Sequence, residues 1–84
     1  MRRNETFVER KTNMRINLKV FRIRQGLSQE RMAERLGMSR SHYSEIENGR
    51  KGCGEAFIER LQKTFGIPDS DVWELVRKEV RKDG

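Results

Sequence analysis

Hydrogen-bonding side chains are concentrated between residues 39 and 51, in the run Ser-Arg-Ser-His-Tyr-Ser-Glu-Ile-Glu-Asn-Gly-Arg-Lys. If Tyr43 and Ile46 face the interior from one side of a helix, the polar side chains lie on its other side. These outward positions are Arg40, Ser41, Ser44 and Glu45. A guanidinium group matches O6 and N7 of guanine with two parallel hydrogen bonds, so Arg40 is the best candidate for reading a base edge. Glu45 either accepts a hydrogen bond from N4 of cytosine or orients Arg40 or Arg50.

Residue types that catalyse reactions or bind metals are scarce. Cys53 is the single cysteine and His42 the single histidine, so an internal disulfide is excluded and a zinc site is not expected. The chain shows no nucleophile paired with a base, no carboxylate dyad and no phosphate loop, so we expect no enzyme and no cofactor. His42 is expected to face solvent or a phosphate, and Cys53 to be an inert thiol.

The excess positive charge lies at one end of the chain. Residues 1–24 contain eight Lys or Arg and two Glu, which accounts for the whole net charge of +6. Residues 1–13 form a basic N-terminal arm, which serves either as a solubilising tail or as an attachment to a polyanion. The 84 residues fit one domain. With neither a secretory signal nor a membrane-spanning run, a cytoplasmic protein is expected.

Helical periodicity follows the arm. Gly26 ends the first helix, Ser28 and Ser39 are good N-caps for the second and third, and Asp69 or Ser70 caps the fifth. The predicted helices span residues 15–25, 29–36, 40–47, 55–65 and about 69–81.

The fifth predicted helix carries an apolar stripe that indicates a dimer contact. This stripe contains Val72, Trp73, Val76 and Val80, with Leu75 beside it and Phe65 nearby at the end of the fourth helix. The first helix has a second stripe of Ile16, Val20 and Ile23. The two stripes partly cover each other, and the remaining apolar surface predicts a symmetric homodimer through the fifth helix.

A set of residues spread over the second and third helices resembles a known family. The set comprises Gly26-Leu27-Ser28-Gln29, Ala33, Leu36-Gly37, Ser39-Arg40-Ser41 and Ile46-Glu47-Asn48-Gly49-Arg50. It is similar to the Cro/repressor type of helix-turn-helix, and the similarity covers about residues 17–67. The resemblance implies an all-α, five-helix, lambda-repressor-like DNA-binding domain over residues 14–84, with the helix-turn-helix formed by the second and third helices.

The resemblance also implies roles for individual residues. Gln29 would contact a phosphate, Arg40 and Ser41 would read base edges, and the loop after the third helix would contact the DNA backbone. The implied DNA-contact set is Gln29, Ser39, Arg40, Ser41, Ser44, Glu45, Asn48, Arg50 and Lys51. Arg22 and Glu47 would form an ion pair that joins the first helix to the third and steers the guanidinium toward a phosphate. Two unrelated surface charges are the alternative for this pair.

These features predict a sequence-specific transcriptional regulator, a repressor or an activator, that binds a two-fold symmetric operator as a dimer. Its size and C-terminal helix are similar to those of the controller proteins of restriction–modification systems, and an immunity repressor fits equally well. The alternative is a protein-interaction module, such as an antitoxin, that masks a partner with residues 1–13. Double-stranded DNA and a second copy are the expected partners, and no small-molecule ligand is expected.

Overall fold

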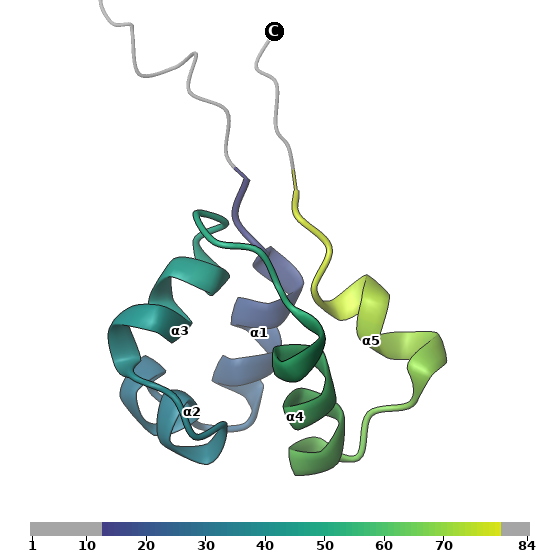
Figure 1. The fold of residues 1–84 in the computed structure, drawn as a ribbon, viewed down its shortest axis with the longest axis horizontal. Coiled ribbons are helices and arrows are strands. Elements are labelled where there is room, and N and C mark those ends of the chain that lie inside the picture. Colours follow the sequence, from purple (N-terminus) through teal and green to yellow (C-terminus); the bar gives the residue numbers. More distant parts are fainter. Residues whose placement is uncertain (1–12, 80–84) are drawn as a thin grey trace, which may run out of the picture.

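The computed structural model describes residues 13–79, which form five α-helices and no strand. The helices are α1 (Ile16–Arg24), α2 (Gln29–Arg35), α3 (Arg40–Glu47), α4 (Glu55–Phe65) and α5 (Asp69–Leu75). Helix α1 lies between the pair formed by α2 and α3 and the pair formed by α4 and α5 (Figure 1). The predicted all-α, five-helix architecture is confirmed, with α2 and α3 packed together as the helix-turn-helix. Most of the predicted arm, residues 1–12, lies outside the described residues.

Local signals set the starts of α2 and α3 and the turn between them. The hydroxyl of Ser28 accepts a hydrogen bond from the Arg31 amide, and the hydroxyl of Ser39 accepts one from the His42 amide, each over 3.1 Å. Both predicted N-caps are therefore confirmed. Gly37 between the helices has a φ of 68°, a left-handed conformation that residues with a side chain rarely adopt. The turn can therefore be short enough to bring the two helices into contact.

All five helices contribute to one hydrophobic core. Leu18 of α1 is fully buried, and so is Leu61 of α4, while Ala33 is buried among the packed helices α2 and α3. The complete core contains Leu18, Met32, Ala33, Leu36, Tyr43, Ile46, Phe57, Ile58, Leu61, Val72 and Val76. Because α3 supplies Tyr43 and Ile46 to this core, its opposite face is directed outward. Among residues 13–79, no helix has the length and apolar character that crossing a membrane requires.

Helix α5 is shorter than the prediction of residues 69–81. It ends at Leu75, and residues 77–79 are not helical. The start of the chain supplies donors here: Asn17 Nδ2 donates to the Glu74 carbonyl over 3.1 Å, and Arg15 Nε donates to the Val76 carbonyl over 2.8 Å. The backbone amide of Glu79 donates to the Met14 carbonyl over 2.9 Å, so it bonds to a residue far away in the sequence and not to a carbonyl of α5. Val80, predicted to extend the apolar stripe, lies outside the described residues.

The predicted N-cap of α5 is also wrong. Pro68 occupies the cap position without a side-chain hydrogen bond, and Asp69 is the first helical residue. The Asp69 carboxylate instead accepts a hydrogen bond from Gln62 Nε2 over 2.7 Å. Gln62 also donates to the carbonyl of Ile67, so this side chain joins the end of α4 to the start of α5.

The apolar stripe of α5 faces mainly its own chain. Val72 is fully buried and Val76 is 7% exposed, so the prediction that these two residues supply a dimer contact is wrong. Phe65 is half-buried, with its ring 5.1 Å from that of Phe21 in an edge-on arrangement. Leu75 is half-buried, whereas Trp73 is 62% exposed. Trp73 is therefore the main apolar side chain that α5 exposes to solvent.

Candidate nucleic-acid interface

Helix α3 presents a polar outer face. Its inward residues Tyr43, Ile46 and Glu47 are buried, and helical geometry places the residues between them toward solvent. Arg40 and Ser41 are exposed in the first turn, and the remaining two predicted recognition residues, Ser44 and Glu45, are half-buried. The structure thus brings the four residues together on one face, as the helical spacing predicted. Ser39, at the N-cap, is exposed beside them.

The loop after α3 carries the three other polar residues predicted to contact DNA. Asn48, Arg50 and Lys51 are all exposed. The amides of Arg50 and Lys51 both donate to the Glu45 carbonyl, over 2.8 and 3.2 Å, so this loop folds back against the last turn of α3. Helix α3 and the loop therefore form one continuous polar surface.

The side chain of Glu45 points toward the loop. Its carboxylate lies 3.6 Å from Lys51 Nζ, and both side chains are about half exposed. The two interpretations drawn from the sequence were a contact to cytosine or an orienting role toward Arg40 or Arg50. The ion pair with Lys51 was not anticipated, and an exposed pair of this kind contributes at most about 1 kcal/mol.

A buried carboxylate, Glu47, connects the first three helices. Arg22 Nε of α1 donates to Glu47 Oε2 over 2.8 Å, and Arg22 Nη2 donates to Oε1 over 3.3 Å. Gln29 Nε2 of α2 donates to Oε1 over 2.9 Å, and the Tyr43 hydroxyl donates to Oε2 over 2.7 Å. The predicted Arg22–Glu47 ion pair is confirmed, and it is only part of a larger network. Both carboxylate oxygens are fully used, which a buried charge requires.

The network fixes the protonation states of its members. Burial opposes ionisation of Glu47, but the hydrogen bonds from Arg22, Tyr43 and Gln29 outweigh it and lower the pKa of this carboxyl below the ordinary glutamate value. The hydrogen bond to Glu47 raises the pKa of Arg22 in spite of its desolvation. Burial and the bond to Glu47 also raise the pKa of Tyr43. Glu47 is therefore ionised and Tyr43 neutral at physiological pH.

One part of the expectation for Arg22 is wrong. Its guanidinium does not reach outward to a phosphate, because the residue is only 8% exposed and Arg22 Nη1 donates to the Leu27 carbonyl over 2.8 Å. Gln29, which was predicted to contact a phosphate, is half-buried at the start of α2. Its side-chain amide donates a hydrogen bond to Glu47, so the position of Gln29 depends on the same carboxylate that anchors α3.

Two members of the site were missed in the sequence. Tyr43 precedes Glu47 by four residues, a spacing that places two side chains of a helix together, so the sequence did contain a signal for this contact. Arg15 is 5% exposed and donates through its side chain to carbonyls of Ile46, Lys51 and Val76. No spacing rule reveals these contacts, because their acceptors are backbone atoms far away in the sequence.

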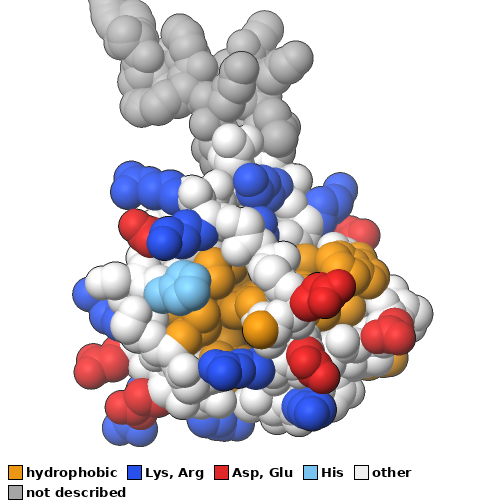
Figure 2. All heavy atoms as spheres, viewed as in Figure 1, with side chains coloured by type: hydrophobic (Ala, Val, Ile, Leu, Met, Phe, Trp, Pro, Cys, Tyr) orange, Lys and Arg blue, Asp and Glu red, His pale blue; other side chains and the backbone are white. Residues whose placement is uncertain are grey.

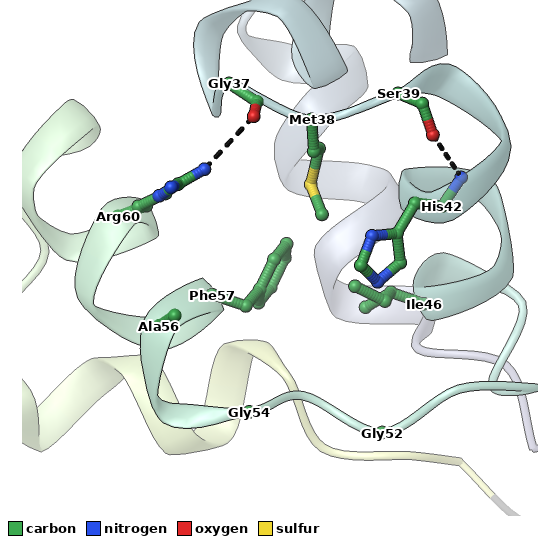
Figure 3. A pocket seen from close by; sticks show the side chains of 10 residues that line it. All are labelled: Gly37, Met38, Ser39, His42, Ile46, Gly52, Gly54, Ala56, Phe57 and Arg60. Atoms are coloured by element: carbon green, nitrogen blue, oxygen red, sulfur yellow. Dashed lines mark hydrogen bonds between the residues drawn. The ribbon is translucent and has the colours of Figure 1, made fainter.

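Helix α4 supports the helix-turn-helix from the side. Arg60 Nη1 donates to the carbonyls of Leu36 and Gly37 over 2.9 and 3.1 Å, which ties α4 to the turn before α3. A hollow of about 480 Å³ lies between this turn and α4, and Figure 3 shows Met38 and Phe57 facing each other within it. The ring of His42 lines its edge, and Figure 2 shows apolar surface beside the histidine. The predicted solvent-facing position of His42 is confirmed.

Comparison with known proteins defines the class of the chain. The model of the helix-turn-helix domain family matches residues 14–75, more than half of the chain. The chain therefore belongs to the helix-turn-helix family of DNA-binding transcriptional regulators, and the resemblance noted in the sequence is confirmed.

Two particular relatives place it within that class. The control protein C.MunI of Mycoplasma sp is 34% identical over 53 residues, which represent 63% of this chain and 72% of that protein. The crystal structure of the hypothetical transcription factor NHTF from Neisseria superposes with a TM-score of 0.63 at 26% identity. This superposition covers 76% of this chain and 68% of the other.

Proposed function

We infer that this protein is a sequence-specific regulator of transcription that inserts α3 into the major groove of an operator. The observation that supports this most directly is the division of α3 into a buried face and a polar outer face. The Glu47 network holds the helix rigidly against α1 and α2, and the outer face is left for recognition. A preorganised reading helix of this kind loses little conformational freedom when it binds.

The residues divide into those that read bases and those that contact phosphates. Arg40 reads a guanine, and Ser41 contacts an adjacent base edge from the same exposed turn. Ser44 and Glu45 lie one turn further along, where Glu45 accepts from cytosine after release from Lys51. The remaining members of the predicted contact set, Gln29, Ser39, Asn48, Arg50 and Lys51, donate to the sugar-phosphate backbone and set the register.

The protein acts as a symmetric dimer through α5. Trp73 is 62% exposed and lies over a hollow that Cys53, Ile58 and Gln62 also line. Figure 2 shows apolar surface on the side of α5, with acidic side chains around it. Burying a large apolar side chain is favourable by about 1.5–3 kcal/mol. In a two-fold contact both subunits bury their own Trp73, so this gain is counted twice. Two recognition helices about 34 Å apart then read half-sites one turn of DNA apart.

A selection experiment tests this function. The protein is mixed with a pool of random duplex DNA, and the bound sequences are recovered and compared. We expect a short motif that is repeated with two-fold symmetry at a spacing of about 10 base pairs. Recovery of unrelated sequences would refute sequence-specific binding. Recovery of a single motif without a symmetric repeat would refute binding as a two-fold dimer.

Sedimentation tests the dimer separately. We expect a dimer at micromolar concentration that Trp73→Ala shifts toward monomer. Ile23 is 55% exposed on α1 and serves as the matched apolar control, so Ile23→Ala should leave the dimer intact. Equal effects of the two substitutions, or a monomer both with and without operator DNA, would contradict assembly through Trp73.

A further inference from the structure

The residues just before α1 pack beneath the loop that follows α3. Gly49 has a φ of 84°, and a Cβ atom built on it would stand only 1.9 Å from the Asn13 carbonyl oxygen. The backbone of Asn13 therefore occupies the space that a side chain at residue 49 would need. Two residues later, the amide of Arg15 donates to the Glu47 carbonyl over 2.8 Å. Residues 13–15 thus form a strap against residues 47–49.

The side chain of Arg15 extends this strap to three more backbone carbonyls. Nη1 donates to Ile46 in the last turn of α3 and, over 3.0 Å, to Lys51 in the loop. Nε donates to Val76 at the end of α5 over 2.8 Å. The carbonyls at a helix C-terminus carry partial negative charge, and Arg15 lies at two such termini. This setting stabilises a guanidinium that is only 5% exposed.

The loop is consequently held from two sides. From α3, the Glu45 carbonyl accepts the amides of Arg50 and Lys51. From the opposite side, Arg15 donates to the Lys51 carbonyl. Removal of the Arg15 side chain would take away the hydrogen bond that holds the Lys51 end of the loop from this second side.

We propose that Arg15 is a positioning residue for DNA binding, which holds residues 48–51 in the conformation that places Asn48, Arg50 and Lys51 against phosphates. Arg15 itself contacts no DNA in this arrangement, because its guanidinium is buried and occupied by carbonyls. The inference rests on the proposed function, since it assigns a role within the DNA complex. A lysine does not replace it, because a compact ammonium group lacks the planar fork that spans three separated acceptors.

DNA binding by Arg15→Ala and Arg15→Lys, measured by fluorescence anisotropy at several salt concentrations, tests the proposal. The control is Leu61→Val, which disturbs a fully buried side chain of α4. All variants are measured at a temperature where thermal melts show each to be folded. Each phosphate contact contributes about 0.9 to the slope of log K against log salt, so we expect the slope of Arg15→Ala to fall by about 1–2. Affinity for preferred and random duplexes should fall in parallel, whereas Leu61→Val should keep the wild-type slope.

Amide hydrogen exchange of the free protein gives a second readout that needs no DNA. We expect exchange at Gly49, Arg50 and Lys51 to accelerate by about tenfold or more in Arg15→Ala, in keeping with the loss of a charge-assisted hydrogen bond. Exchange in α4 should rise no more than it does in Leu61→Val. If Arg15→Ala does not fold, folded Arg15→Lys is used, and a smaller change in the same direction is expected.

The outcomes separate the two proposals. Wild-type slope and wild-type loop exchange in a folded Arg15 variant would overturn the positioning role while leaving DNA binding established. Failure of the wild-type protein to bind any duplex would instead refute the proposed function, and with it the role of Arg15 in DNA binding.

Discussion

Removal of the Glu47 carboxylate is the most informative perturbation of this fold. In Glu47→Ala, Arg22 loses its carboxylate partner while its side chain stays 10% exposed, and the fully buried Tyr43 hydroxyl loses its acceptor. Gln29 is half-buried and can turn to water, so its loss costs little. The substitution therefore leaves a buried cation without a counter-charge, with only the Leu27 carbonyl still bound to Arg22 Nη1, and a buried hydroxyl without its acceptor.

The expected loss of stability is large for a domain of this size. Breaking a buried ion pair by removing one partner costs about 3–5 kcal/mol, because the other charge stays behind uncompensated. An unsatisfied buried hydroxyl costs about 1–3 kcal/mol by itself, although partial relaxation makes the two contributions less than additive. We expect Glu47→Ala to lower the free energy of unfolding by about 4 kcal/mol, from a total of about 5–15 kcal/mol for a typical domain.

Urea unfolding followed by circular dichroism at pH 7 measures this loss. Arg22→Met and the double variant Arg22→Met/Glu47→Ala complete a thermodynamic cycle. Because the double variant no longer buries an unpaired charge, it should be more stable than the sum of the two single losses predicts, by about 2 kcal/mol or more. A loss below about 1 kcal/mol for Glu47→Ala, or an additive cycle, would refute the view that Glu47 is the structural centre of the site.

Three further predictions concern pH, recognition and the loop. Glu47 has a lowered pKa in the folded state, so the stabilisation that its ionised form gives the fold is fully present above about pH 4.3 and is lost as the pH falls through the folded pKa. The urea midpoint of Glu47→Gln should therefore depend less on acid pH than that of the wild-type protein. Parallel curves for the two proteins would contradict this. In anisotropy titrations, Arg40→Ala should weaken binding to the preferred operator by about 1–3 kcal/mol and relax selectivity at one base pair. Lys51→Ala should weaken binding to the operator and to random DNA equally. Equal losses on both DNAs for Arg40→Ala would exclude Arg40 as a base reader. Gly49→Ala should lower the midpoint of thermal unfolding and cost at least about 1–2 kcal/mol of stability, because Gly49 has a left-handed φ and lies against the Asn13 carbonyl. The control Gly52→Ala should be neutral, because its added methyl group would meet no atom within 4 Å. Equal melting midpoints for the two variants would show that the packing at Gly49 does not constrain the fold.

The predictable parts of the fold depend on local signals. Gly26, Ser28 and Ser39 mark helix boundaries through hydrogen bonds and backbone angles within a few residues, and the structure confirms each of them. The outward face of α3 follows from helical periodicity alone. These interactions need no knowledge of the tertiary structure, so the sequence was sufficient to predict them.

The errors occurred where distant segments meet. Helix α5 ends at Leu75, where Arg15 and Asn17, distant in the sequence, donate to the carbonyls of Val76 and Glu74. Val72 and Val76 have the spacing of an exposed stripe, but a stripe reveals nothing about whether the same chain or a second one covers it. The family pattern pointed to Arg22 and Glu47, and the four-residue spacing within α3 contained a signal for the contact of Tyr43. The contacts of Gln29 and Arg15 became apparent only in three dimensions.

Different residues of α3 form its buried face and its outer face, and this division affects how mutation can change the DNA sequence that such a protein binds. Three of its eight residues, Tyr43, Ile46 and Glu47, are committed to the interior. Arg40 and Ser41 contribute nothing to the hydrophobic core or to the bonds of Glu47, so under the proposed function mutations there are expected to alter recognition without a large penalty in folding. If α3 reads the operator as proposed, a few substitutions on its outer face are enough to redirect the protein to a new sequence, and the outer face of a relative can be transferred onto the same scaffold.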